Sequence, residues 1–279
     1  MLNPAYALIA ALIWAFSPIY YRGFLGKFDF ISFNFLRTST ASAVLILPAI
    51  YYWSYTGLGY AVPSGIITLG CGDSFFLLSI RETGASVAAP VVYTYVLMVQ
   101  IVGVALGQGV PYANFAAAVM VIVGVYILSK GGETKPRAKG IAFAISAGVF
   151  WTIGQELIQL ATGLGGSIVA VTFTRNAAAA VALGVALLLT RKRRTWGSGL
   201  PARQYGFMLL IVTSDLVLGS LFFVYSISTI GVALSVILTS ISPLLTQIFA
   251  RALGKESPSP RDFVGGILIV AALVIAVSL

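Results

Sequence analysis

The chain consists mainly of long apolar segments joined by short polar links. About 20 helical residues, each adding about 1.5 Å, are needed to cross the hydrocarbon of a bilayer. Ten segments reach this length or come near it: 4–21, 31–53, 61–80, 84–106, 112–129, 140–160, 166–190, 204–228, 231–250 and 262–279. The sequence therefore predicts an all-α polytopic membrane protein with ten transmembrane helices.

The balance of apolar and charged residues supports this interpretation. Hydrophobic residues make up 59% of the chain and charged residues only 9%, whereas about a quarter of the residues of a soluble protein are charged. The net charge of +9 could suggest nucleic acid, but the basic residues lie in short links rather than along one face. We expect the lipid bilayer and a small-molecule substrate as partners, and no nucleic acid.

A polar linker at 130–139 divides the chain into two similar halves. The first half is 1–129 and the second is 140–279, and each is expected to hold five helices. Several residues recur at matching places: Trp14 with Trp151, Phe35-Leu36-Arg37 with Phe173-Thr174-Arg175, Gly84 with Gly231, and Gln100 with Gln247. An internal duplication is the simplest explanation.

The basic residues indicate how the halves are oriented. Lys and Arg occur in the links after odd-numbered helices and in none of the links after even-numbered ones. By the positive-inside rule, the odd-numbered links are cytoplasmic and both termini are extracytoplasmic in the cell (plasma or inner) membrane. Because each half has an odd number of helices, the second copy must enter the membrane inverted. Inverted repeats are typical of secondary transporters, whose substrate lies near the midplane.

Motifs in both halves resemble a known transporter superfamily. The stretch from Gly231 through Pro243 to the Gly254-Lys255-Glu256 turn, followed by Gly265-Gly266, is similar to the ninth and tenth helices of the drug/metabolite transporter superfamily. Phe35-x-Arg37 and Phe173-x-Arg175 resemble the Arg-bearing start of the second helix of each repeat.

Over its whole length the chain resembles the ten-helix EamA-type branch of that superfamily. It departs from the family pattern at Gly107-Gln108, where Gly-Glu is frequent, and at Pro90, which is displaced from the place equivalent to Pro243. The resemblance implies export or exchange of small metabolites. The amino acid exporters of the YddG type are well-known bacterial members.

Five charged residues fall inside the predicted spans, where each costs about 2.5–3.5 kcal/mol to insert. They are Arg37, Asp73, Glu156, Arg175 and Asp215. In the functional interpretation they line a polar cavity between the halves. The carboxylates would bind an amino group or take up the proton that drives export, because burial disfavours their charged form, and the arginines would hold a carboxylate. The alternative is that these groups pair between helices only to support the structure.

Neutral groups deep in the spans are weaker candidates for substrate contact. Trp14 and Trp151 lie about ten residues inside their helices, too deep for the interfacial belt where Trp usually concentrates, so they could line a pocket or simply pack. The other candidates could bind substrate or only join helices: Ser17, Tyr93, Gln100, Gln155, Tyr225, Ser240 and Gln247.

These features favour a transporter over an enzyme. The chain has no histidine, one cysteine and no GxxxxGK[ST] loop, so we expect no catalytic residue, metal, cofactor or ATP site. We predict a secondary active transporter, a monomer or weak homodimer, that moves amino acid-like or amphiphilic metabolites by alternating access, as an exporter. The alternative is a membrane-embedded enzyme or lipid-handling protein that uses the intramembrane carboxylates.

Overall fold

The fold is almost entirely helical in the part of the chain that the computed structural model describes: 4–54, 56–129, 137–190, 195–197, 199–253 and 260–278. These ranges hold no strand, and their single isolated β-bridge joins Phe28 and Trp196. Seven helices are long and apolar enough to cross a membrane, and two shorter apolar ones cover Ala5–Tyr21 and Phe263–Ser278. The prediction of an all-α polytopic membrane protein is confirmed. Three polar stretches used in the topology argument lie outside the described residues: 130–136, 191–194 and Lys255.

The helices of the first half follow the predicted spans closely. They are α1 (Ala5–Leu25), α2 (Phe30–Tyr51), α3 (Leu58–Gly65), η1 (Ile66–Gly72), α4 (Asp73–Thr83), α5 (Ala85–Val92), α6 (Tyr95–Ala105) and α7 (Tyr112–Ser129). The Asp29 side chain caps α2 by accepting a hydrogen bond from Ser32 N at 3.2 Å, which satisfies an otherwise unpaired amide of the first turn. Helices α3, η1 and α4 run on as one span, Leu58–Thr83.

The second half repeats this order of elements. Its helices are α8 (Ala138–Gly163), α9 (Ile168–Leu189), α10 (Ala202–Thr213), η2 (Ser214–Gly219), α11 (Ser220–Thr239), α12 (Ser242–Ala252) and α13 (Pro260–Ser278). The elements η1 and η2 are π-helices, which are rare and concentrate at functional sites. They end at Gly72 and Gly219, two residues with the same separation in the chain as Gly84 and Gly231.

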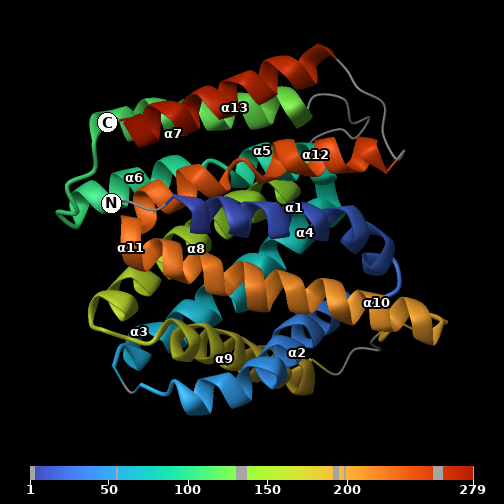
Figure 1. The fold of residues 1–279 in the computed structure, drawn as a ribbon. Coiled ribbons are helices and arrows are strands. Elements are labelled where there is room, and N and C mark those ends of the chain that lie inside the picture. Colours follow the sequence, from blue (N-terminus) through green and yellow to red (C-terminus); the bar gives the residue numbers. More distant parts are fainter. Residues whose placement is uncertain are drawn as a thin grey trace.

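Single glycines replace the short links predicted at 81–83 and 229–230. Helix α4 continues to Thr83, and α11 passes through 229–230. The chain turns instead at Gly84 (φ 79°, ψ 157°) and Gly231 (φ 79°, ψ 163°), a conformation open to glycine because it lacks a Cβ. Figure 1 shows the chain running from α10 along α11 and returning along α12.

The predicted spans 84–106 and 231–250 are each divided into two helices. The first is interrupted between α5 and α6, and the second between α11 and α12. Pro243 lies in the first turn of α12, where its missing N–H costs nothing but a preceding helix cannot continue unchanged. Pro90 removes one backbone donor inside α5, shortly before the first break.

The two halves pack across one another. Helix α1 of the first half contacts η2, α11 and α12 of the second, while α8 of the second half contacts η1, α4, α5 and α6 of the first. Helices α7 and α13 lie together along one edge of the bundle, and α2 and α9 along the opposite edge (Figure 1). A Cβ on Gly124 of α7 would lie 2.9 Å from Gly265 O of α13, so glycine allows these two backbones to touch.

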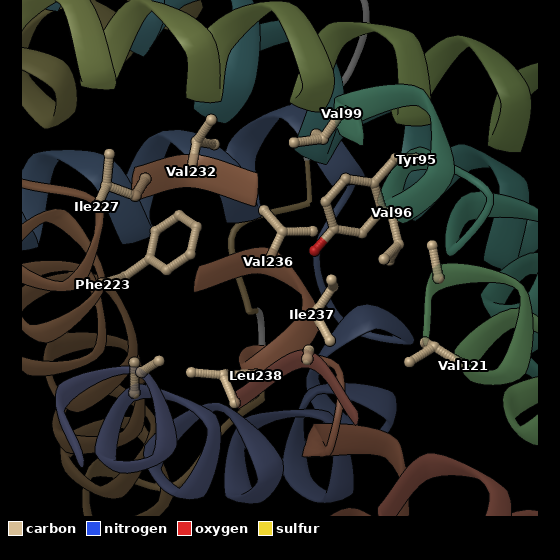
Figure 2. Close-up of a cluster of buried hydrophobic side chains, with 14 of the residues drawn as sticks. Tyr95, Val96, Val99, Val121, Phe223, Ile227, Val232, Val236, Ile237 and Leu238 are labelled. Carbon is tan, nitrogen blue, oxygen red and sulfur yellow. The ribbon is translucent and has the colours of Figure 1, made fainter. Parts of the chain in front are cut away.

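The largest buried apolar cluster joins α6, α7 and α11. Figure 2 shows Val96, Val99 and Val121 facing Val236 and Ile237 of the part of α11 that follows its glycine. Phe223 and Ile227 continue the cluster toward the earlier part of α11. Packing of this kind holds helices together in lipid, where burial of apolar area supplies little force.

Candidate functional site

Each π-helix offers a backbone carbonyl to an asparagine. Asn34 of α2 donates from Nδ2 to Leu69 O in η1 at 2.7 Å, and Asn176 of α9 donates to Leu216 O in η2 at 3.4 Å. The wide turn of a π-helix leaves carbonyls that the α-helical ladder would otherwise use. In each half, a hydrogen bond from an asparagine to a π-helix carbonyl therefore joins the third span to the second helix.

A buried ion-pair cluster centred on Arg37 lies beside these two π-helices. Arg37 of α2 is 6% exposed. Its Nη1 donates to Asp73 Oδ2 of α4 at 3.1 Å, and its Nη2 donates to Asp215 Oδ2 of η2 at 2.9 Å. Asn34 Oδ1 accepts a further bond from Nη1 at 3.2 Å. One guanidinium thus joins a carboxylate of the first half to a carboxylate of the second.

Tyr21, which was not among the residues predicted from the sequence, completes this cluster. Its hydroxyl donates to Asp215 Oδ2, and its ring lies 5.0 Å from the Arg37 guanidinium, as in a cation–π contact. Trp14, Ser17 and Tyr21 are spaced so that they share one face of α1. That spacing was the signal that could have found Tyr21.

The two tryptophans are placed crosswise between the halves. Trp151 of α8 donates from Nε1 to Asp73 Oδ1 at 3.1 Å, and Trp14 of α1 donates to Asp215 O at 3.1 Å. Each indole also lies against the glycine that ends a π-helix, since a Cβ on Gly72 would be 2.5 Å from Trp151 Cδ1, and one on Gly219 would overlap the Trp14 ring. Both tryptophans therefore border the charged cluster.

Arg175 occupies the matching place in α9 but has a different environment. It is 2% exposed, and its Nε donates to Ser64 Oγ of α3 at 2.9 Å. Ser64 in turn donates to Gly154 O of α8 at 2.6 Å. A Cβ on Gly65 would overlap the carbonyl of Arg175, so α3 and α9 touch at this level. No sequence pattern singles out Ser64.

Glu156 lies apart from the Arg37 cluster, where Gln108 Nε2 donates to its Oε2 at 2.6 Å. Gln108 belongs to the link between α6 and α7 and lines a small cavity of about 230 Å³. The same cavity is lined by Gln159, whose Oε1 accepts a 2.6 Å bond from Val232 N, just beyond the Gly231 turn. This region forms a second polar contact between the halves.

Three further candidates, Tyr93, Gln155 and Tyr225, lie in aromatic surroundings. Gln155 lies against Tyr95, whose ring centroid is 5.9 Å from that of Tyr93 and 5.4 Å from that of Trp151. These aromatic rings extend the Trp151 side of the cluster. The Tyr225 ring is tilted by 50° against that of Tyr6, with 4.3 Å between the centroids, and Tyr225 is 39% exposed, so the structure separates it from the site.

Three amide and hydroxyl candidates bond to backbone carbonyls. Gln100 donates to Ala233 O at 3.1 Å, Gln247 donates to Leu128 O at 3.0 Å, and Ser240 donates to Val236 O at 2.7 Å. The first two tie neighbouring helices together, as polar residues in membranes often do. Within the described ranges, no group of three or more His, Cys, Asp or Glu side chains could hold a metal ion.

Comparison with known proteins identifies the family. The model of the EamA-like transporter family matches residues 3–130 and 138–278. The chain belongs to this family. An uncharacterized transporter of Archaeoglobus fulgidus is 26% identical over 283 residues, covering 99% of this chain and 98% of its own. A protein of known crystal structure shares the fold with a TM-score of 0.81 at 18% identity, over 98% of this chain and 95% of that one. This EamA-like protein is thus a multi-pass membrane transporter.

Proposed function

We propose that this EamA-like protein is a secondary active transporter that exports small amino acid-like or amphiphilic metabolites by alternating access, with proton uptake at Asp73 or Asp215 as the coupled step. The observation that carries the proposal is the bridge made by Arg37. Its two carboxylate partners come from opposite halves of the chain, so a change in one of these bonds acts on the contact between the halves.

Protonation is suited to change these bonds. A buried ion pair is strong only while both partners are charged, and loss of one partner leaves an uncompensated charge that costs about 3–5 kcal/mol. A proton on Asp215 removes the attraction that holds η2 to α2, while the Asp73 bond stays within the first half. The protonated state would therefore release one half from the other, which is what alternating access requires.

In the proposed topology this bridge lies toward the cytoplasmic side. With extracytoplasmic termini, the end of α2 near Asp29 is cytoplasmic, and Arg37 lies about two turns inside it. The cavity at Gln108 is then on the extracytoplasmic side. Substrate would lie between these two polar contacts, bordered by Trp14 and Trp151.

The coupling is tested by transport into proteoliposomes that contain the purified protein. Panels of amino acids, amines and phosphorylated metabolites are supplied with and without a pH gradient. Asp73→Asn and Asp215→Asn should lose most of the gradient-driven uptake but keep exchange at uniform pH. Glu82→Gln is the matched control, because Glu82 is partly exposed and lies 3.9 Å from the exposed Arg137. Full gradient-driven transport by both aspartate variants would place the coupling elsewhere.

The topology is tested with single cysteines after Cys71→Ser. Tyr112→Cys, at a residue that is 94% exposed, should react with an impermeant maleimide from outside intact cells. Thr195→Cys, in the link between α9 and α10, should react only after the cells are opened. The reverse pattern would invert the proposed orientation.

A further inference from the structure

Arg175 is a buried cation with no carboxylate partner in the part of the chain that the structure describes. Its guanidinium makes one hydrogen bond there, from Nε to Ser64, and it forms no ion pair with a described residue. The charge of Asp73 acts on Arg175 through space, but Asp73 is bonded to Arg37 and Trp151 instead. The two terminal nitrogens of Arg175, which carry four N–H donors, are left over.

The sequence explains why Arg175 differs from Arg37. At Arg37 the two carboxylates come from η2 and α4. The matching places in the other half, found by the separation that relates the two π-helices, hold Thr68 in η1 and Ser220 in α11. A hydroxyl therefore stands where each carboxylate would be. Thr68 Oγ1 is itself buried and makes no hydrogen bond to a described residue.

A guanidinium buried in a membrane protein without a counter-charge is unfavourable unless something supplies one. Resting on the transport function proposed above, we propose that Arg175 binds the carboxylate of the transported molecule. The planar guanidinium offers two parallel N–H donors, and a carboxylate accepts two. Ser64 holds Nε, so that the unused nitrogens keep a fixed direction.

The test measures thermal unfolding of the full-length protein in nanodiscs made only of phosphatidylcholine, titrated with benzoate, phenylalanine or the neutral benzamide. The two carboxylates should stabilise the wild type, and Arg175→Gln should weaken their apparent affinity roughly 10- to 100-fold, because charged hydrogen bonds are lost. Arg203→Gln is the matched control and should bind them as the wild type does. Without ligand, Arg175→Gln should unfold at or above the wild-type temperature, because it removes an uncompensated charge.

Four results would overturn this assignment. They are no stabilisation of the wild type by either carboxylate, equal stabilisation of Arg175→Gln, equal stabilisation by benzamide, and unfolding of ligand-free Arg175→Gln well below the wild type. Stabilisation that appears only with phosphatidylglycerol in the discs would assign Arg175 to a lipid headgroup instead and would also refute the proposal. None of these results depends on the gradient-driven uptake of the aspartate variants, so the two proposals can fail separately.

Discussion

Two polar regions connect the halves of this transporter, and they use different chemistry. At the Arg37 cluster the connection is charged, because a guanidinium joins carboxylates of both halves. Near the Gly231 turn it is made by side-chain amides, with Gln108 donating to Glu156 and Gln100 donating to Ala233 O. In the first region a proton on either aspartate would remove an ion pair, whereas in the second region a proton on Glu156 would change only a hydrogen bond to the neutral amide of Gln108. We therefore expect the first region to respond more strongly to protonation.

The largest effect is expected from removing the centre of the charged region. Arg37→Gln leaves two carboxylates buried without their cation, and this should cost about 3–5 kcal/mol of stability. Thermal unfolding in detergent measures the loss. The triple variant Arg37→Gln, Asp73→Asn, Asp215→Asn should recover much of it, since no buried charge remains unpaired. If Arg37→Gln is as stable as the wild type, the cluster does not hold the halves together.

A smaller effect is expected at the amide region. Gln108→Ala removes a bond to the Glu156 carboxylate, a loss of about 1.5–3 kcal/mol for a hydrogen bond to a charged group. The variant should open the cavity near Gly231, so that a cysteine at Val110 is alkylated faster. Glu156→Gln keeps a partner for Gln108 and should react at nearly the wild-type rate. Equal alkylation rates in both variants would show that Gln108 does not close this end.

The smallest effect is expected from the turn itself. Gly231→Ala places a Cβ where the nearest neighbour is Gln159 Oε1 at 3.6 Å, so the cost is the backbone strain of holding alanine at φ 79° and ψ 163°, about 1–3 kcal/mol. Gly206→Ala in α10 is the control, because its Cβ would meet nothing within 4 Å and the change should stabilise the helix by about 0.5–1 kcal/mol. Urea or thermal unfolding measures whether each substitution lowers or raises the stability. Stabilisation by both substitutions would mean that the turn at Gly231 relaxes readily.

Local sequence patterns were enough for the helices and for the charged candidates. Apolar length predicted the spans, and the cost of a charge in lipid pointed to Arg37, Asp73 and Asp215 before any contact was known. The structural alternative, in which these charged groups pair between helices, agrees with the contacts that Arg37 makes. The role of these residues in transport stays a prediction.

The contacts across the halves could not be read from the sequence. The pairing of Arg37 with Asp215 joins residues 178 positions apart. The periodicity of apolar residues along one helix cannot predict a contact between residues so far apart in the chain. The π-helices were also missed, since a surplus residue within a helix leaves hydrophobicity unchanged. The single-glycine turns were missed because Gly84 and Gly231 look like ordinary link residues until their φ angles are known.

The π-helices give the two aspartates a way to change direction without unfolding a span. One residue in an α-helix corresponds to a rotation of about 100°, and a π-helix holds one residue more than its α-helical turn needs. Asp73 follows η1 directly, and Asp215 lies inside η2. If the π-helical turn moved along the chain past Asp73 or Asp215, the carboxylate of that aspartate would rotate by about a quarter of a revolution, away from Arg37. A shift of one residue along either span would thus separate its aspartate from Arg37 while the helix stays intact.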